Sequence, residues 1–171
     1  MMKKIFIPIL FLSFLFSQEV QDGPFKSYHS NGKVEMEGTI KNGKEDGLWK
    51  MYYESGRIEG EGTFKDGKLN GPFKSYYENG QLEMIGNYKY DLEDGLWKYY
   101  WENGQLEAEE TFKDGEYHGP YKDYYENGQL QSEGRMVNGK EDGLWKFYDE
   151  NGRLVAEGTL RDGELIDSRE Y

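Results

Sequence analysis

The stretch Asp94–Gly115, DGLWKYYWENGQLEAEETFKDG, contains the features that decide the fold. It holds two short turn signals, Asn103-Gly104 and Asp114-Gly115, separated by segments in which apolar and polar residues alternate. Alternation with a period of two, bounded by Asn-Gly or Asp-Gly, is typical of short β-strands joined by tight turns. The stretch therefore predicts a β-hairpin.

The same stretch recurs along the chain with a period of 24 residues. A glycine opens each copy, at Gly23, Gly47, Gly71, Gly95, Gly119 and Gly143. Copies begin near residues 22, 46, 70, 94, 118 and 142, and a Pro form (GPFK or GPYK) alternates with a Leu-Trp form (GLWK). A self-similar period of this length indicates an array whose units bury surface mainly against their neighbours. The alternation indicates duplication of a 48-residue unit of two hairpins.

Each copy carries two turn signals. The first occurs at Asn31-Gly32, Asn79-Gly80, Asn103-Gly104, Asn127-Gly128 and Asn151-Gly152, with Ser55-Gly56 as a variant. The second occurs at Asn42-Gly43, Asp66-Gly67, Asp114-Gly115, Asn138-Gly139 and Asp162-Gly163, and Tyr90-Asp91 interrupts this series. Because Asn-Gly tolerates positive φ at both residues, we expect type I′ turns at the first signal. Two turns in each copy predict two strands in each copy, and thus about twelve strands in a continuous antiparallel meander.

A two-residue loop at the first signal fixes the register of every hairpin. In the fourth copy it sets Trp101 opposite Leu106, Tyr99 opposite Ala108 and Lys98 opposite Glu109. The same rule pairs Lys26 with Glu37, Lys50 with Glu61, Lys122 with Glu133 and Lys146 with Glu157, whereas Lys74 meets Ile85. Opposite charges directly across a ladder contribute ~0.2–1 kcal/mol each. The five Lys–Glu pairs support the register, because neither residue type was used to assign the turns.

The register also predicts two unlike faces. On one face it sets large rings opposite glycines: Phe25–Gly38, Trp49–Gly62, Phe73–Gly86, Tyr121–Gly134 and Trp145–Gly158, with Trp97–Glu110 as the exception. A ring over a strand glycine restores the packing that glycine lacks. The fold class is thus all-β, with six tandem 24-residue β-hairpin repeats forming an elongated, twisted, single-layer antiparallel meander, roughly 55–60 Å long. No second layer covers the aromatic face, and only curvature of the sheet itself could cover it. We therefore expect that face to be exposed and to mark an interaction site.

These residues resemble a known family. The stretch Asp94–Gly115 is similar to the MORN repeat, in particular to its bacterial variant with a G-x-W-x-x-Y-Y-x-N-G-x-L core, and the resemblance covers all six copies. Asp91 and Glu110 occupy glycine positions of that pattern. The resemblance implies stacked β-hairpins in an elongated single-layer sheet used for protein–protein contacts, with some members proposed to touch lipids. Similar bacterial proteins are often labelled YwqK-family antitoxins of toxin–antitoxin systems.

The N-terminus has the pattern of an export signal. Lys3 and Lys4 precede the apolar run 5–16, which is too short for a transmembrane helix and fits a signal peptide over residues 1–17. We therefore expect a repeat array over residues 18–165, a C-terminal tail over 166–171, and a periplasmic or extracellular location. Without residues 1–17, which carry two lysines and no acid, the formal net charge falls from −12 to −14. That charge disfavours nucleic acid and anionic membrane surfaces as partners.

The sequence contains no pattern that indicates an enzyme or a cofactor site. The chain has no cysteine, and its two histidines, His29 and His118, lie in no metal-ligand spacing. The carboxylates are spread evenly by the repeat, whereas a catalytic pair should be singular. Acidic turns such as Glu45-Asp46 lack the EF-hand spacing for calcium. We expect no catalytic residue, no cofactor and no metal.

The aromatic residues remain as candidates for a partner-binding site. Trp49, Trp97 and Trp145 fall on the aromatic face, where the simplest role is a packing spine. A tyrosine series falls on the charged face, at Tyr28, Tyr52, Tyr76, Tyr100, Tyr124 and Tyr148. Tyrosine is enriched at interfaces, although β-propensity alone also explains such a series. We therefore expect a non-enzymatic protein-binding or scaffolding module, with self-association possible. Two alternatives stay open: an envelope-glycan-binding module that uses the aromatic rows, and an antitoxin-like role.

Overall fold

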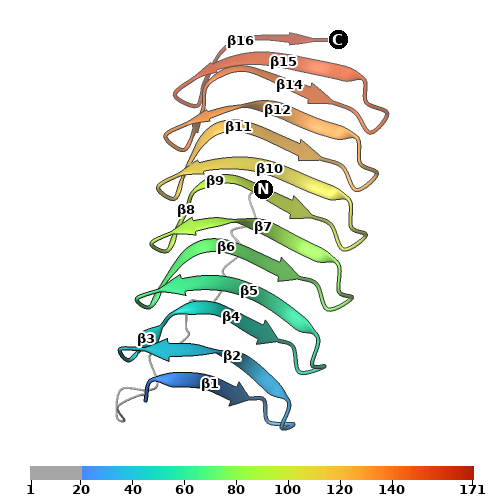
Figure 1. Ribbon diagram of the computed structural model, residues 1–171. Helices are drawn as coiled ribbons and strands as arrows, with labels where there is room; N and C mark the ends of the chain where they lie inside the picture. Colours follow the sequence, from blue (N-terminus) through green and yellow to red (C-terminus); the bar gives the residue numbers. More distant parts are fainter. Residues whose placement is uncertain (1–20) are drawn as a thin grey trace.

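A computed structural model describes residues 21–171 and places them in one antiparallel sheet of sixteen strands. The strands follow one another in chain order from one end of the sheet to the other, and each is curved (Figure 1). The predicted fold class, six hairpin repeats in a single-layer meander, is confirmed. Within residues 21–171 no helix is long and apolar enough to cross a membrane. The predicted signal peptide lies outside the described residues.

Thirteen strands make up the continuous path of the sheet. They are β1 (Gly23–Tyr28), β2 (Val34–Lys41), β4 (Gly47–Tyr52), β5 (Ile58–Lys65), β6 (Lys68–Tyr76), β7 (Leu82–Lys89), β9 (Gly95–Tyr100), β10 (Leu106–Lys113), β11 (Glu116–Tyr124), β12 (Leu130–Val137), β14 (Gly143–Tyr148), β15 (Leu154–Arg161) and β16 (Glu164–Glu170). Three strands of two residues pair beside this path: β3 (Lys44–Glu45), β8 (Leu92–Glu93) and β13 (Lys140–Glu141).

The two sequence forms produce two kinds of strand. Where the copy has the Leu-Trp form, its first strand is divided, as β3 and β4 are, at the residue before a glycine with φ near 80° such as Gly47. Where an internal copy has the Pro form, the strand runs unbroken as β6 or β11, and the glycine before the proline, such as Gly71, has φ near 135°. The 48-residue alternation read from the sequence is therefore also a structural alternation.

The residues after the sixth copy add one more strand to the sheet. The segment 166–171, predicted to be a tail, lies largely in β16, which pairs along β15. Arg169 faces Glu157 in that ladder, but Ser168 stands opposite Gly158, where earlier copies place a ring. The last strand thus extends the backbone ladder without extending the aromatic packing.

The prediction of type I′ turns at the first signal is wrong. Among the residues of the Asn-Gly turns only the glycine has positive φ, as at Gly104 with 84°. The Gly104 amide donates to the Trp101 carbonyl at 2.8 Å, which is a type I turn followed by a left-handed glycine. Asn103 stays at negative φ because its side chain is engaged with the backbone that follows, where Oδ1 accepts from the Gln105 amide at 2.8 Å.

Type I′ geometry occurs instead at the second signal. Both turn residues there have positive φ in every copy, for example Asn42 at 53° and Gly43 at 70°. The interrupted third copy keeps the same turn, with Tyr90 at 53° and Asp91 at 69°. Left-handed φ in a residue such as tyrosine costs of order 1 kcal/mol or more, so the surrounding ladder imposes this turn on an unfavourable sequence.

The predicted register holds although the predicted turn does not. Leu106 faces Tyr100 and not Trp101, so the pairing next to the turn is shifted by one residue. A bulge at Glu107 then removes the shift, and Ala108 faces Tyr99 as predicted. The same bulge follows the first turn of every copy, and therefore all five predicted Lys–Glu pairs are present in the ladder.

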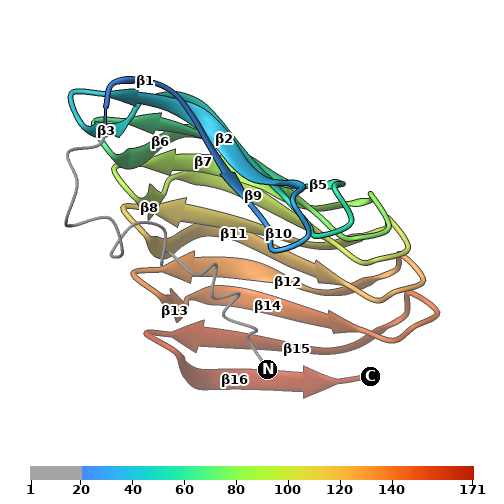
Figure 2. The same ribbon diagram turned by 90° about the horizontal axis from the view of Figure 1, so that it is seen from below.

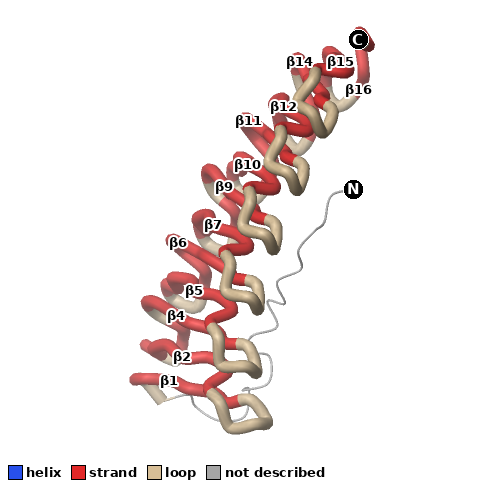
Figure 3. The backbone as a smooth tube through the Cα atoms, turned by 90° about the vertical axis from the view of Figure 1, so that its right-hand side faces the viewer, coloured by secondary structure: helices blue, strands red, loops and turns tan. Residues whose placement is uncertain are grey.

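Side chains at the first turn join each repeat to the next. Asn31, Asn79, Asn103 and Asn127 each donate from Nδ2 to the carbonyl of a turn glutamate one repeat on, at 2.9–3.1 Å. In the second copy Ser55 replaces the asparagine, and the Arg57 guanidinium supplies the missing bond to the Glu78 carbonyl at 2.7 Å. Tyrosine hydroxyls add a parallel series, such as Tyr53 to the Tyr76 carbonyl at 2.6 Å. Figure 3 shows the array as an elongated stack with a loop projecting at each level.

Aromatic rings supply the core of this single layer. Trp97 is 1% exposed and lies in a cluster with Phe73, Tyr88 and Phe112. The Trp97 and Tyr88 ring centroids are 4.9 Å apart and nearly perpendicular, an arrangement favoured by the ring quadrupoles. The predicted ring–glycine pairs are correct in register, but the ring that covers a glycine comes from the following strand: Trp97 of β9 lies over Gly86 of β7. Trp49 and Trp145 cover Gly38 and Gly134 in the same way.

The contact of Trp97 with Gly86 predicts a sharp penalty for an added methyl group. A Cβ at residue 86 would overlap the Trp97 ring, whereas a Cβ at Gly62 would meet the flexible end of Leu69 at 2.9 Å. We expect Gly86→Ala to lower the free energy of unfolding by about 3 kcal/mol or more, since a buried tryptophan must leave its place. Gly62→Ala should cost about 1 kcal/mol. Urea denaturation followed by tryptophan fluorescence measures both, and equal losses would contradict the assignment of the covering ring.

Candidate binding surfaces

The sheet has two faces of opposite character. We call the face that carries the tryptophans and Phe73 the aromatic face, and the reverse, which carries the Lys–Glu pairs, the charged face. The aromatic face was expected to be exposed, and this expectation is wrong. Trp49, Trp97 and Trp145 are 4%, 1% and 4% exposed, because neighbouring rings cover them on a sheet that curves (Figure 2). The three predicted tryptophan contacts are therefore out of reach of a partner in this structure.

The charged face carries one row of alternating charge that crosses the whole sheet. Thirteen residues stand side by side in cross-strand register, one from each strand of the path. In order they are Lys26, Glu37, Lys50, Glu61, Lys74, Ile85, Lys98, Glu109, Lys122, Glu133, Lys146, Glu157 and Arg169. We call this series the charge row. Its closest ion pairs, Lys26–Glu37 and Lys98–Glu109, have nitrogen–oxygen distances of 2.7 Å.

The predicted tyrosine series lies beside the charge row. The Tyr52 hydroxyl donates to Glu37 at 2.7 Å, and Tyr148 donates to Glu133 at 3.0 Å, which places both rings on the charged face. Partial burial, and next the acceptor carboxylate of Glu37, raise the pKa of Tyr52 to about 12. Tyr52, Tyr76, Tyr100, Tyr124 and Tyr148 are half-buried, and Tyr28 at the sheet edge is 59% exposed. The four tyrosines predicted to bind a partner, at 52, 76, 100 and 124, thus share one face and remain accessible.

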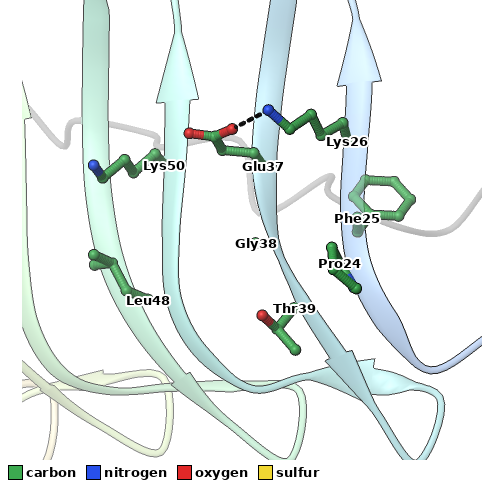
Figure 4. A pocket seen from close by; sticks show the side chains of 8 residues that line it. All are labelled: Pro24, Phe25, Lys26, Glu37, Gly38, Thr39, Leu48 and Lys50. Atoms are coloured by element: carbon green, nitrogen blue, oxygen red, sulfur yellow. Dashed lines mark ion pairs between the residues drawn. The ribbon is translucent and has the colours of Figure 1, made fainter.

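Leucines of the Leu-Trp form stand out from the same face. Leu48, Leu96 and Leu144 are 52%, 49% and 51% exposed, and they recur every 48 residues. Leu48 lines a shallow pocket of about 260 Å³ together with Pro24, Thr39 and the charge-row residues Lys26, Glu37 and Lys50. Figure 4 shows the Glu37 carboxylate lying between the two lysine chains. The volume is below the usual range for small-molecule sites, so the pocket belongs to a protein-contact surface more readily than to a ligand site.

The charge row is interrupted at one position. Ile85 of β7 lies between Lys74 of β6 and Lys98 of β9, where every other internal copy has a glutamate between two lysines. The hydroxyls of Tyr52 and Tyr124 each donate to the glutamate 15 residues earlier in the chain. For the equivalent Tyr100, the residue 15 positions earlier is Ile85. In the sequence, Ile85 is recognisable only as an irregular partner of Lys74. The signal that singles it out is its departure from a repeat that is otherwise strict.

A second departure lies on the aromatic face. Glu110 replaces the glycine of the other copies and is only 9% exposed. Burial raises its pKa to about 7, although hydrogen bonds from Tyr117 and Tyr99 oppose the shift. The charges of Glu107 and Asp123 raise it further, and Asp123 Oδ1 is buried without a hydrogen-bond partner in the described part of the chain. The fourth and fifth copies therefore meet at a buried acidic group surrounded by tyrosines.

Residues 21–171 contain no group of three or more acidic or histidine side chains placed to hold a metal ion. His29 has a structural role, with Nε2 2.6 Å from the Tyr52 carbonyl in the same inter-repeat series as the tyrosines. The accessible chemistry of the described surface is thus a periodic arrangement of charge, tyrosine and leucine.

Comparison with known families agrees with this periodicity. The model described as "MORN repeat variant" matches six tandem segments, 21–42, 45–66, 69–90, 93–114, 117–138 and 141–162. The chain belongs to the MORN repeat variant family. Members of this family carry a repeat module that is in general non-catalytic. No curated protein matches the chain. The matched MORN segments coincide with the structural repeats, including the third and fourth copies that hold Ile85 and Glu110.

The raised pKa of Glu110 predicts that its own contribution to the stability of the MORN array is larger at acid pH. A carboxyl group whose folded-state pKa lies above its unfolded value contributes stability that is present below pH 4.5 and is lost as the pH rises toward 7. Replacement by glutamine removes this dependence. We expect Glu110→Gln to gain about 3 kcal/mol in free energy of unfolding, relative to the unaltered chain, between pH 4 and pH 8.

Urea denaturation at the two pH values checks this expectation. Glu109→Gln is the matched control, because Glu109 is the adjacent residue on the charged face and pairs with Lys98 at 2.7 Å. That variant should lose a few tenths of a kcal/mol at pH 8 and gain nothing. A pH-independent effect of Glu110→Gln would show that Glu110 titrates normally.

Proposed function

We propose that this chain is a protein-binding or scaffolding module that binds its partner through the charged face, outside the cytoplasm. The observation that carries the proposal is the contrast in access between the two faces. The tryptophans are almost fully buried, whereas the tyrosine series and the leucines at 48, 96 and 144 remain accessible on the charged face. Half-buried tyrosines present a large, rigid contact area at low entropic cost.

The geometry favours a partner that follows the array. The tyrosine and leucine positions recur along one face at intervals of 24 and 48 residues, two and four strands of ~4.8 Å spacing. A partner that extends across several repeats would contact equivalent positions in each. The alternating charges of the row fix the orientation of such a partner more than they add affinity.

The glycan-binding alternative keeps only part of its support, because the tryptophans of the aromatic rows are buried while the tyrosines stay accessible. The antitoxin alternative has no observation in its favour among the described residues. Export rests on the sequence of residues 1–17 alone.

Site-specific photo-crosslinking in native cells tests which face binds. Two variants, with benzoylphenylalanine in place of Leu144 or of Tyr124 on the charged face, should yield the same dominant crosslinked product. The matched control is Phe147, which is 41% exposed on the aromatic face, and its yield should be at least about 5-fold lower. Equal yield from Phe147, or no product from either charged-face position, would contradict the proposal. Light scattering on the purified chain determines whether the product contains a second copy.

A reporter fusion tests the export component separately. A periplasm-active reporter joined after residue 21 should be active, because Lys3, Lys4 and the apolar run 5–16 form the expected signal. Replacing Leu10 and Leu12 with lysine should abolish the activity. Activity that survives these replacements, or a reporter that is inactive from the start, would remove export from the proposal.

A further inference from the structure

The intact form of one charged-face unit is visible in the first two copies. Figure 4 shows Glu37 between Lys26 and Lys50, with Pro24 and Leu48 as apolar neighbours. Glu37 Oε2 lies 2.7 Å from the Lys26 ammonium, and its Oε1 accepts from the Tyr52 hydroxyl at 2.7 Å. One carboxylate therefore satisfies a lysine and a tyrosine and lies beside a second lysine.

The same unit recurs 48 residues later without its carboxylate. Pro72, Lys74, Leu96, Lys98 and Tyr100 occupy the equivalent positions, and Ile85 takes the place of Glu37. The donors that surround a glutamate elsewhere are thus all retained. Only the acceptor has been replaced, and isoleucine has no group that can accept a hydrogen bond.

The two lysines beside Ile85 have fewer acidic neighbours than their equivalents. Lys50, Lys122 and Lys146 each stand between two glutamates in the ladder. Lys74 has Glu61 on one side only, at 3.5 Å, and Lys98 has Glu109 on one side only, at 2.7 Å. Both face Ile85 on the other side. The charge row thus has one carboxylate fewer at this point, near the middle of the charged face, than at its other internal positions.

Exposed apolar residues also lie toward the turn at the end of the same strand. In the third copy Tyr90 replaces the Asn or Asp of the second turn, and Leu92 stands where the other copies have lysine or glutamate. Tyr90, Leu92 and Leu96 are 57%, 45% and 49% exposed, and Leu92 reaches across to Gly115 of the next turn. The third copy has therefore lost a charge and gained exposed apolar area.

From these observations we infer that the third copy is the anchor point of the proposed interface, where a glutamate or aspartate of an extended, otherwise apolar partner segment takes the place of the absent carboxylate. The inference rests on the proposed function and names the partner chemistry at one point of that surface. The partner carboxylate lies over Ile85 between the Lys74 and Lys98 ammonium groups and accepts from the Tyr100 hydroxyl. Apolar side chains two and four positions away in the partner, which an extended segment places on the same side as the carboxylate, cover Leu96 and Leu92.

The net charge of the chain sets a limit on this interaction. An acidic partner is repelled at long range, but at physiological ionic strength the screening length is about 8 Å, so only the nearest charges act. The two lysines and the tyrosine hydroxyl are the nearest donors. Selectivity therefore comes from contact geometry, and a carboxylate elsewhere on this face meets glutamates that are already in place.

The test uses the full chain, labelled with ¹⁵N, and a peptide probe, acetyl-Leu-Ala-Glu-Ala-Leu-amide, in 150 mM salt. We expect saturable shifts of the backbone amides at Lys74, Ile85 and Lys98. The amide analogue acetyl-Leu-Ala-Gln-Ala-Leu-amide should bind at least about 5-fold more weakly, because a neutral acceptor gains no charge-assisted hydrogen bonds. Equal affinity for the two peptides, or no saturable shift at these residues up to 20 mM peptide, would overturn the inference.

Two variants at residue 85 complete the test. Ile85→Glu supplies the carboxylate within the chain and should abolish peptide binding, while it keeps the fold, since the other copies carry glutamate at this position. Ile85→Leu is the matched control and should bind as the unaltered chain does. Retained binding by Ile85→Glu would overturn the inference. Crosslinks from Leu144 and Tyr124 that persist while the peptide fails would leave the module function standing and remove the anchor point alone.

Discussion

The fold depends on a single constraint: a sheet of one layer must build its core from the side chains of its own face. The core is built by packing a large ring of one strand over a glycine of its neighbour. A tryptophan of one strand occupies the space that a glycine of the preceding strand leaves free, as Trp97 does over Gly86. Both residues are needed, because the ring without the gap has nowhere to lie and the gap without the ring exposes backbone. The curvature of the sheet, the turn geometry and the period of 24 residues all keep this contact in register.

The constraint divides the two faces by role. The side chains of the aromatic face are buried in the core. Residues on this face that depart from the repeat, Glu110 above all, therefore affect stability. The side chains of the charged face contribute less to the core. Residues on this face that depart from the repeat therefore alter the chemistry of the surface. A change from glutamate to isoleucine at residue 85 leaves the ladder intact and changes the chemistry of one point on the surface.

Much of this arrangement could be predicted from the sequence because the repeat multiplies weak signals. One Lys–Glu pair would have supported little, but five in the same register fixed the pairing of Lys98 with Glu109. The turn type at Asn103-Gly104 was missed, since propensity alone does not reveal that the asparagine side chain bonds the following chain and the next repeat. The bulge at Glu107 was missed for a related reason. The turn shifts the strand pairing by one residue and the bulge shifts it back, so the register of the residues beyond the bulge is unchanged. The burial of Trp49, Trp97 and Trp145 required the curvature of the sheet, which no local pattern encodes.

The alternation of divided and unbroken strands also bears on how such an array changes in length. Each tryptophan covers a glycine of the Pro-form copy before it, so this ring–glycine contact lies inside each pair of copies, whereas the joints between pairs rest on the long ladders of β5 with β6 and β10 with β11. Loss of the fifth copy from the gene would set Trp145 against Glu110 and leave this ring without its gap. Loss or gain of 48 residues would rejoin matching halves. We therefore expect homologues to differ in size by whole pairs more often than by single copies.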